Sequence, residues 1–401
     1  MKYDLIFEGG GAKGMVLVGA FQEFEKRGHT FDRLLGTSAG AITAALLAAG
    51  YNSQALLAVL NERDRDRDQP IFTTFMGAPE PFGTAELNAS VLSTHLHKLD
   101  LPFIPAFLED KLDTQIVNAL AQQPQFRHLF SFVERGGWYS AQGFVNWLQQ
   151  KLSTGAVHGK PRAFSTMNLA DFYQATGVEM TLIASDTTEA RMLVLNHRTA
   201  PQCPVVWAVR MSMSIPLLWP EVIWQASWGL YRGRDLTNHA IVDGGLLSNF
   251  PIELFVSDQP EVIAVMGPKQ QRNVLGCLID ELLPVEGAPP PQTGSSPLET
   301  LRTVQRIERL VNTAISGHDK MVVEAFEQLV VRLPAKGYGT TEFNMNDARR
   351  NALVAAGQLA MQQYFDTLLP AMAATARGLE PADNEPIKQA ADRAAIRLLA
   401  Q

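Results

Sequence analysis

The stretch Gly36-Thr37-Ser38-Ala39-Gly40 places a serine between two glycines, each two residues away. The preceding segment Phe31–Leu35 is short and ends in apolar residues, as buried strands do. The following segment Ala41–Ala49 is rich in helix formers and is closed by Gly50, a typical helix C-cap. A strand, a sharp turn and a helix around a serine form a nucleophile elbow, whose strained turn exposes the hydroxyl. We therefore predict that Ser38 is a nucleophile in an elbow formed by Gly36 and Gly40; a plain turn is the alternative.

The composition is that of a folded protein. The chain has 401 residues, of which 46% are hydrophobic and 19% charged, enough for one large or two small domains. The net charge of -7 argues against nucleic acid as the main partner, because phosphate contacts need a clustered basic surface. The first residues do not resemble a signal peptide, and no uncharged apolar run reaches the roughly 20 residues that span a bilayer. We therefore expect a cytoplasmic protein.

The first 50 residues predict a βαβ unit, made of a strand at Leu5–Phe7, a helix at Met15–Arg27 and the strand before Ser38. Such a unit indicates a parallel sheet with helices on its faces. Four later segments are strand-like: Thr181–Asp186, Arg191–Leu195, Ala240–Val242 and Val262–Val265, of which the last is expected to close the sheet-forming part.

The pattern loosens between about residues 54 and 165, where many aromatic residues lie on short segments broken by proline. We interpret this region as a helical insertion that lies over the site. The aromatic side chains either fill a second small core or form a lipid-facing lid. The alternating charges of Arg63–Asp68 are expected to be solvated or paired with one another.

We divide the chain into a catalytic domain, residues 1–266, and a C-terminal extension, residues 267–401, whose helices pack on the core. Within the extension, prolines and a Gly-Ser-Ser run predict a flexible loop at about 281–297. A helix at 298–328, a strand at 329–333 and a helix at about 346–369 follow. The tail after Gly378 is weakly amphipathic and is expected to dock on its own protein rather than on a membrane.

Three glycine-marked turns each follow directly on an apolar strand: residues 9–14, residues 36–40 and Asp243-Gly244-Gly245. In a parallel sheet these turns would meet at the carboxyl edge, where open α/β folds place their sites. The first turn leads into a helix and offers free backbone N–H groups, which suit the oxyanion formed when a serine attacks an ester. We therefore assign Gly10 and Gly11, with Gly9 as a further candidate, to an oxyanion hole.

Dinucleotide binding is a competing interpretation of the first turn. Gly9, Gly11 and Gly14 also spell G-x-G-x-x-G after a strand, and Asp32 lies near the distance expected of a ribose-binding acid. However, Asp32 comes before its strand, and that strand ends in the serine turn. The pattern therefore favours the oxyanion hole.

Asp243 is the candidate base for Ser38, because it follows a strand and precedes two glycines that allow close backbone approach. A carboxylate with an ordinary pKa near 4 is a poor base for a hydroxyl, whereas burial would raise the pKa and improve it. A histidine is the usual alternative in serine hydrolases. Among the eight histidines, His239 and His318 are the best candidates for that role.

Taken together, the three glycine turns resemble, in order and spacing, the signatures of patatin-like phospholipases. The stretches Arg210–Pro216 and Asn249-Phe250-Pro251 also resemble that family, and the resemblance covers residues 4 to about 266. There are two mild departures from the family pattern. Lys13 stands where arginine is frequent, and a glycine, Gly245, closes the aspartate motif where alanine is usual.

The resemblance implies a three-layer α/β sandwich with a central, mostly parallel sheet. It also implies a Ser-Asp dyad without histidine, in which Ser38 is the nucleophile and Asp243 the base. The first glycine turn would supply the oxyanion hole, and the supporting motif residues would be Lys13, Gly14, Gly244 and Gly245. No metal, calcium included, and no organic cofactor is implied for the attack on phospholipid or lysophospholipid esters.

The sequence thus predicts a lipid acyl hydrolase of the phospholipase A or lysophospholipase type. Contact with a membrane surface would be transient and made by apolar side chains, because the net charge is negative. The alternative from another class is an effector-gated or non-catalytic interaction protein, with the aromatic insertion as its partner surface. Some patatin-like proteins are activated by a small nucleotide or a host protein, and nothing in this sequence marks such a site.

Overall fold

The computed structural model describes residues 1–64, 66–91, 123–157, 159–268, 273–290, 313, 326–376 and 385–400. Its centre is an eight-stranded sheet with the strand order β12-β11-β1-β2-β7-β10-β9, in which β8 also pairs with β7. The five strands from β12 to β7 are parallel, and β8, β9 and β10 run antiparallel to their neighbours. The predicted mostly parallel sheet is therefore confirmed. The strands are β1 (Lys2–Phe7), β2 (Thr30–Thr37), β7 (Glu179–Asp186), β8 (Arg191–Leu195), β9 (Val222–Ile223), β10 (Ala240–Asp243), β11 (Asn273–Pro284) and β12 (Val330–Lys336).

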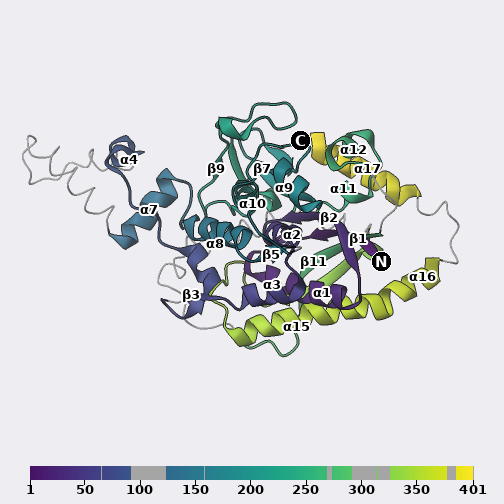
Figure 1. The fold of residues 1–401 in the computed structure, drawn as a ribbon. Helices are drawn as coiled ribbons and strands as arrows, with labels where there is room; N and C mark the ends of the chain where they lie inside the picture. The colour runs from purple at the N-terminus through teal and green to yellow at the C-terminus, as the bar shows by residue number, and fades with distance from the viewer. Residues whose placement is uncertain are drawn as a thin grey trace, which may run out of the picture.

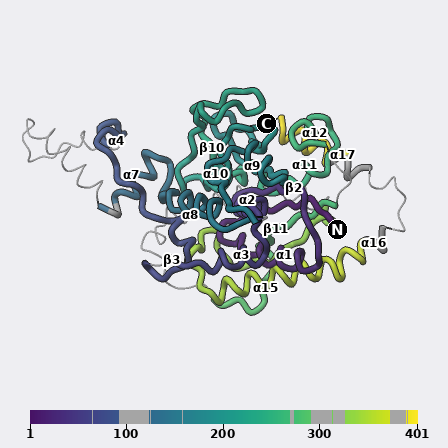
Figure 2. Tube along the Cα trace, viewed as in Figure 1, coloured from purple at the N-terminus to yellow at the C-terminus, as the bar shows by residue number. Residues whose placement is uncertain are grey.

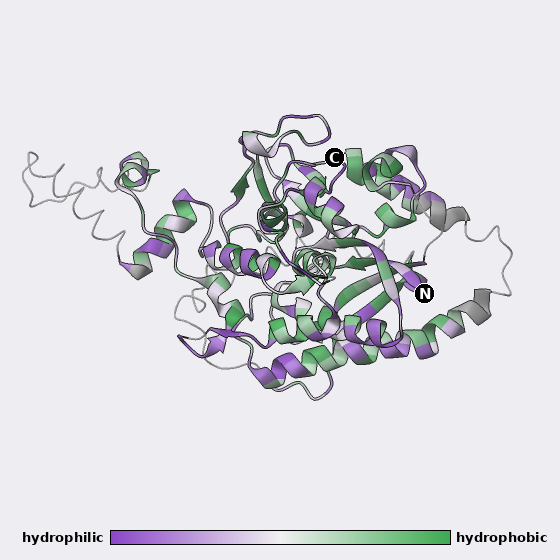
Figure 3. Cartoon of the chain, viewed as in Figure 1, coloured by the Kyte–Doolittle hydropathy of each residue, from purple (hydrophilic) through white to green (hydrophobic). Residues whose placement is uncertain are grey.

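Helices cover both faces of the sheet, so the fold has three layers (Figure 1). Alternate side chains of each strand point to opposite faces. In β1, Leu5 and Phe7 belong to one apolar cluster and Ile6 to the other. The first cluster includes side chains of α1 (Met15–Lys26), α2 (Ala39–Ala48), α3 (Ser53–Leu60) and α15 (Asp347–Gln363). The second includes side chains of α11 (Glu253–Val256), α12 (Pro260–Met266) and α17 (Glu385–Ala400). Figure 3 shows the hydrophobic colour concentrated on the central strands.

Two strands of the sheet come from the part of the chain after residue 266. β11 pairs with β1 and β12 pairs with β11, both in parallel. The long helix α15 packs along α1, after which the chain continues through a π-helical turn, Tyr364–Leu368, into α16 (Leu369–Ala376). The C-terminal helix α17 buries Ala391, Ala395 and Leu398. The expectation that the tail docks on its own protein is confirmed for this helix, which lies against α11 and α12.

Two predictions of secondary structure were wrong. Residues 262–265 lie in the helix α12, which has Pro260 in its first turn, and do not form a strand. The sheet-forming part therefore continues past this segment, into the unpredicted strand β11 and the predicted strand at 329–333, which β12 contains. Most of the predicted helix at 298–328 and residues 291–297 of the predicted loop lie outside the described residues. Residues 281–284 of the predicted loop belong to β11 instead.

The region between about residues 54 and 165 contains several short elements that leave the body of the fold. Figures 1 and 2 show α4 (Thr84–Ala89) and α7 (Pro124–Glu134) lying away from the central sheet. Four aromatic side chains pack against one another in this region and join the main core: Phe72, Phe75, Phe144 and Trp147. The other elements are a 3-10 helix (Ile71–Met76), α8 (Gln142–Ser153), and two small hairpins, β3 (Arg63–Asp64) with β4 (Gln69–Pro70) and β5 (Ala156–Val157) with β6 (Lys160–Pro161).

The structure describes several further helical elements elsewhere along the chain. They are two helices, α9 (Leu169–Thr176) and α10 (Val205–Ser212), and the 3-10 helices Gly11–Gly14, Ala226–Trp228, Gly244–Leu246 and Glu327–Leu329.

Candidate active site

The turn between β2 and α2 has the strained backbone of a nucleophile elbow. Ser38 follows the last residue of β2 with a φ of 53° and a ψ of −119°, a conformation that residues other than glycine rarely adopt. Its neighbours must be small, because a Cβ added at Gly36 would collide with the Gly40 carbonyl, and one at Gly40 with the Phe7 carbonyl. The strand, turn and helix predicted around Ser38 are present.

Asp243 lies at the same level of the sheet as Ser38, but the strand before it runs in the opposite direction to the predicted one. β10 runs antiparallel to β7, so the expectation that all three turns follow parallel strands was wrong. In the pairing register, Thr37 of β2 is opposite Ile183, and Asp243 is opposite Ala184. β7 extends three residues beyond its pairing with β2, and β10 pairs with this overhang while running back toward the elbow. Because β10 is only four residues long, it ends at Asp243, beside Ser38.

The Asp243 carboxyl is fully buried. Burial raises its pKa from 3.8 to about 7, against the opposing effects of the Ser38 hydroxyl and the Gly245 N–H, which both lower it. Its Oδ1 accepts the Gly245 N–H at 2.8 Å. Its Oδ2 has no hydrogen bond of ordinary geometry within the described part of the chain, although the Ser38 hydroxyl is near enough to influence the pKa. A carboxyl with a pKa near 7 can accept a proton from a serine far better than one near 4.

The end of α10 supports both residues. The Ser212 hydroxyl accepts the Ser38 N–H at 3.1 Å and donates to the Ile183 carbonyl at 2.5 Å. The Ser214 carbonyl accepts the Asp243 N–H at 2.9 Å. The sequence pointed to this stretch only through its resemblance to a family, and the role of Ser212 was not predicted. A serine at the end of a largely apolar helix was the available signal.

The first glycine turn lies against the elbow. A Cβ added at Gly9 would sit 2.8 Å from the Ser38 Cβ. The Ala12 N–H is bonded to the Thr340 carbonyl at 2.8 Å, whereas the N–H groups of Gly10 and Gly11 have no acceptor among the described residues. The structure therefore brings the predicted oxyanion turn to Ser38 with backbone donors available.

The supporting residues of the three turns lie within this arrangement. Lys13 is buried, and its ammonium forms an ion pair with Glu281, which is 268 residues away in the sequence and half exposed. The partner of Lys13 is thus a residue on β11, distant in the sequence. Gly14 lies against the Ala39 side chain and Gly244 against the Ile183 carbonyl, where in each case a Cβ would collide.

The alternative residues lie elsewhere or are not described. His239 Nδ1 lies 2.8 Å from Asp186 Oδ2, so this imidazole is engaged with a different carboxylate from Asp243. His318 lies outside the described residues. Asp32 is near the amino end of β2, away from Ser38, and pairs with Lys2 at 3.2 Å. This position does not suit an acid that binds ribose at the carboxyl end of the sheet.

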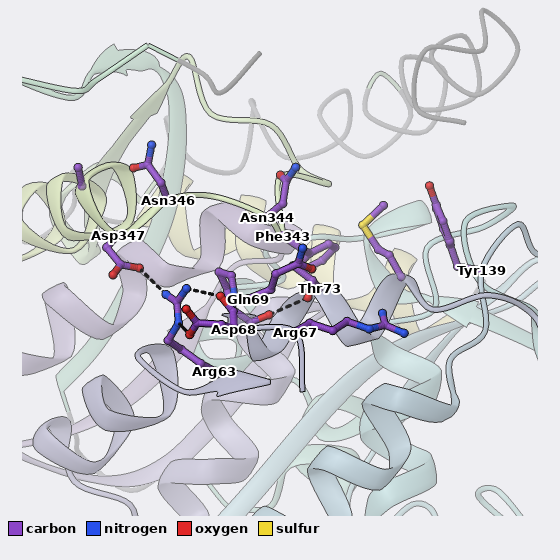
Figure 4. Close-up of a pocket in the computed structure, with 13 residues that line it drawn as sticks. Arg63, Arg67, Asp68, Gln69, Thr73, Tyr139, Phe343, Asn344, Asn346 and Asp347 are labelled. Atoms are coloured by element: carbon purple, nitrogen blue, oxygen red, sulfur yellow. Dashed lines mark hydrogen bonds and ion pairs between the residues drawn. The ribbon is translucent and has the colours of Figure 1, made fainter. Parts of the chain in front are cut away.

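A cavity of about 820 Å³ opens beside the loop that contacts the first glycine turn. Phe343 lines the cavity, and Thr340, three residues earlier, accepts the Ala12 N–H. Neither Ser38 nor Asp243 lines it. Figure 4 shows Arg63 joined to Asp68 and to Asp347 at its edge. The pair with Asp68 is within the charge run, as expected, whereas Asp347 belongs to α15.

Comparison with known proteins places this arrangement in a family. A family model described as patatin-like phospholipase matches residues 5–256, the segment that contains all three glycine turns. The chain belongs to the patatin-like phospholipase family. Uncharacterised protein YqhO of Bacillus subtilis is 26% identical over 373 residues, which cover 91% of this chain and 98% of that protein. An uncharacterised NTE family protein of Mycobacterium bovis is 27% identical over 265 residues, which cover 65% of this chain but only 29% of that protein.

Two solved structures are similar to this patatin-like chain at low sequence identity. VipD from Legionella pneumophila has a TM-score of 0.43 and 16% identity, with 91% of this chain and 67% of that chain covered. The ExoU–SpcU complex from the type III secretion system of Pseudomonas aeruginosa has a TM-score of 0.40 and 16% identity, with 99% and 59% covered. Among the residues that the structure describes, no helix has the length and apolar character needed to cross a membrane.

Proposed function

We propose that this patatin-like protein is a lipid acyl hydrolase that cleaves phospholipid or lysophospholipid esters through an acyl-enzyme on Ser38. One observation carries the proposal. A fully buried Asp243, whose pKa burial raises to about 7, lies at the end of β10, on the same edge of β7 as the strand that leads into a serine held in a strained elbow. A strained backbone turn makes the folded state less stable, so it is kept where it serves a function. Its presence beside a carboxyl with a raised pKa favours a reactive site over a plain turn.

The proposed reaction uses only groups of this chain. Asp243 accepts the proton of the Ser38 hydroxyl as Oγ attacks the ester carbonyl, and the oxyanion faces the N–H groups of Gly10 and Gly11. Asp243 then gives its proton to the leaving alcohol as the ester bond breaks. A water molecule attacks the acyl-enzyme as Asp243 takes its proton, and Asp243 then gives this proton to Ser38 Oγ as the fatty acid is released. General base catalysis contributes about 10²- to 10⁴-fold, and each oxyanion donor about 10²- to 10³-fold.

We further propose that the substrate is reached at a membrane surface through transient apolar contact. Three exposed apolar side chains lie along α7, Phe126, Leu129 and Val133, with exposed fractions of 41%, 42% and 45%. Their spacing of three and four residues puts them on one face of the helix, while His128 is buried on the opposite face. Such an apolar stripe suits shallow insertion at a lipid interface. Attraction to anionic head groups is less suitable, because the net charge of the chain is -7.

The test is product analysis after incubation with vesicles that contain several phospholipid and lysophospholipid classes. Mass spectrometry should find free fatty acid and the matching deacylated lipid with the wild type. Ser38→Ala should abolish both products, whereas Ser153→Ala, which removes a surface hydroxyl bonded to Ser165, should leave them unchanged. Equal product formation by Ser38→Ala and the wild type would exclude Ser38 as the nucleophile.

A latent or effector-gated state of the same site is the second candidate, and one observation favours it. Ser38 is only 5% exposed and Asp243 is not exposed at all. A lipid ester therefore needs an opening of the structure before it reaches the serine. Intact protein that resists a fluorophosphonate in buffer but reacts in the presence of vesicles would support this state, and equal labelling in both would count against it.

A further inference from the structure

Asn249 joins the loop after Asp243 to the first glycine turn. The residue lies six positions after Asp243, and only 5% of it is exposed. Its Nδ2 donates to the Gly9 carbonyl at 3.0 Å and to Glu8 Oε1 at 3.1 Å. One side chain thus spans two segments that are 240 residues apart in the sequence.

The Gly9 carbonyl and the Gly10 N–H belong to one planar peptide unit, in which a trans bond makes them point in opposite directions. A hydrogen bond that holds the carbonyl therefore also fixes the direction of the N–H. Without such a bond, a unit between two glycines would rotate more freely than any other, because neither residue has a Cβ. The Gly10 N–H has no acceptor in the described part of the chain, so no hydrogen bond of its own orients it there.

Glu8 in turn holds Asn249. Its side chain is buried beneath the turn, where Oε1 accepts from Asn249 and Oε2 accepts the backbone N–H of Ile279 in β11. The Ile279 side chain also lies against Gly10, where a Cβ would collide with it. The Glu8 carboxylate therefore connects the Asn249 amide to the central sheet. The Asn249 amide in turn connects to the glycine turn.

We propose that Asn249 is a positioning residue, which orients the Gly9–Gly10 peptide so that the Gly10 N–H faces the oxyanion, and that Glu8 orients Asn249. This inference rests on the proposed function, because it assigns a role within the oxyanion hole of the acyl hydrolase. In this role both side chains act through the Gly9–Gly10 peptide.

Asn249→Ala should therefore lower kcat without a matching change in KM. Loss of a whole oxyanion donor lowers kcat by about 10²- to 10³-fold. Here the donor remains but is no longer held, so we expect a smaller loss of about ten- to a hundredfold. Asn168→Ala is the matched control, since Asn168 caps α9 through the Asp171 N–H at 2.8 Å and lies outside the site. The control should lose stability but keep kcat.

A pair of substrates separates positioning from a merely structural role. The full-length protein is assayed on a soluble ester and on the same ester with sulfur in place of the carbonyl oxygen. Because sulfur is a weak hydrogen-bond acceptor, an intact oxyanion hole prefers the oxygen ester. The ratio of kcat/KM between the two esters should fall about tenfold in Asn249→Ala and stay at the wild-type value in Asn168→Ala.

Glu8→Gln provides the second variant, and it carries the same test if Asn249→Ala fails to fold. It should also lower the oxygen-to-sulfur ratio, and the double variant should lose no more than the more impaired single variant, because both act on one peptide. A ratio that stays at the wild-type value in the folded variants overturns the positioning role while the hydrolase stands. A wild type that cleaves neither ester and resists fluorophosphonate with vesicles present overturns the hydrolase proposal and this inference together.

Discussion

Replacement of Asp243 by asparagine should abolish ester hydrolysis and at the same time make the protein more stable at alkaline pH. The sign follows from burial, which raises the pKa of this carboxyl from 3.8 to about 7 in the folded protein. The native state therefore holds the proton more tightly than the unfolded state, so stability falls as the pH rises from about 4 to about 7, and the loss is complete above that range. Asparagine cannot ionise and is free of this loss.

The magnitude follows from the two pKa values. The penalty for ionising Asp243 in the folded state is about 2 kcal/mol at pH 5 and about 4 kcal/mol above pH 8. The stability of the variant relative to the wild type should therefore grow by about 2 to 3 kcal/mol between these conditions. For a chain of 401 residues the entropy of unfolding is roughly 0.8 kcal/mol per kelvin, so the difference in Tm should widen by about 3 °C. The comparison between two pH values cancels any constant effect of the new amide.

The assay is thermal unfolding of both proteins at about pH 5 and pH 8.5, together with hydrolysis of a soluble ester. Asp186→Asn is the matched control, because Asp186 is buried but accepts hydrogen bonds from His239 and from the N–H groups of Thr188 and Glu189. We expect it to lower Tm at both pH values, since the amide cannot satisfy all these donors. If the Asp243→Asn Tm difference stays constant with pH, or if the variant retains turnover, the carboxyl is not the buried base described above.

Four further predictions follow from the same geometry. The kcat/KM of the wild type should rise about tenfold per pH unit below pH 7 and level off above it, because Asp243 must lose its proton to act as a base; a flat profile from pH 5 to 8 would contradict this. Gly40→Ala should lower the folded yield or Tm, because its Cβ collides with the Phe7 carbonyl, whereas the exposed Gly83→Ala, read in the same melting experiment, should not. Leu129→Glu should weaken cosedimentation of the protein with vesicles while leaving hydrolysis of a soluble ester intact. Unchanged cosedimentation would show that this face of α7 does not bind the membrane. His239→Ala should retain most of the esterase activity, since the imidazole pairs with Asp186; loss of activity at full stability would restore histidine as the base.

The sequence predicted the elbow correctly because its signals are local. Gly36, Ser38 and Gly40 lie within five residues, and the strand and helix beside them have strong apolar patterns. The class of the fold followed from the βαβ unit at the start of the chain. Such short-range patterns determine which element forms, and the structure contains them where they were expected.

The direction and neighbours of the strands are not local properties. The pattern of Ala240–Val242 predicts a strand, but nothing in those residues shows that β10 runs antiparallel to β7. The run Val262–Val265 is only four apolar residues long, a length at which helix and strand patterns cannot be told apart. β11 was missed although it is paired on both sides in the sheet, because Gly276 and Asp280 interrupt its apolar pattern.

The contacts that complete the site were equally out of reach of the sequence. Lys13 pairs with Glu281, and Asn249 bonds to Gly9, each across more than 200 residues. The raised pKa of Asp243 also depends on side chains that only the fold brings together. Motifs therefore pointed to the candidate residues, whereas the packing around them could be described only from the structure.

The most direct test of the account is the site and rate of phosphonylation by a fluorophosphonate in the presence of vesicles, read by intact mass and peptide mapping. We predict that the wild type gains one phosphonyl group on Ser38, at a rate that rises through about pH 7 and falls sharply in Asp243→Asn. Labelling at another residue, or an equal rate in the two proteins at every pH, would contradict the claim that a buried aspartate activates this serine.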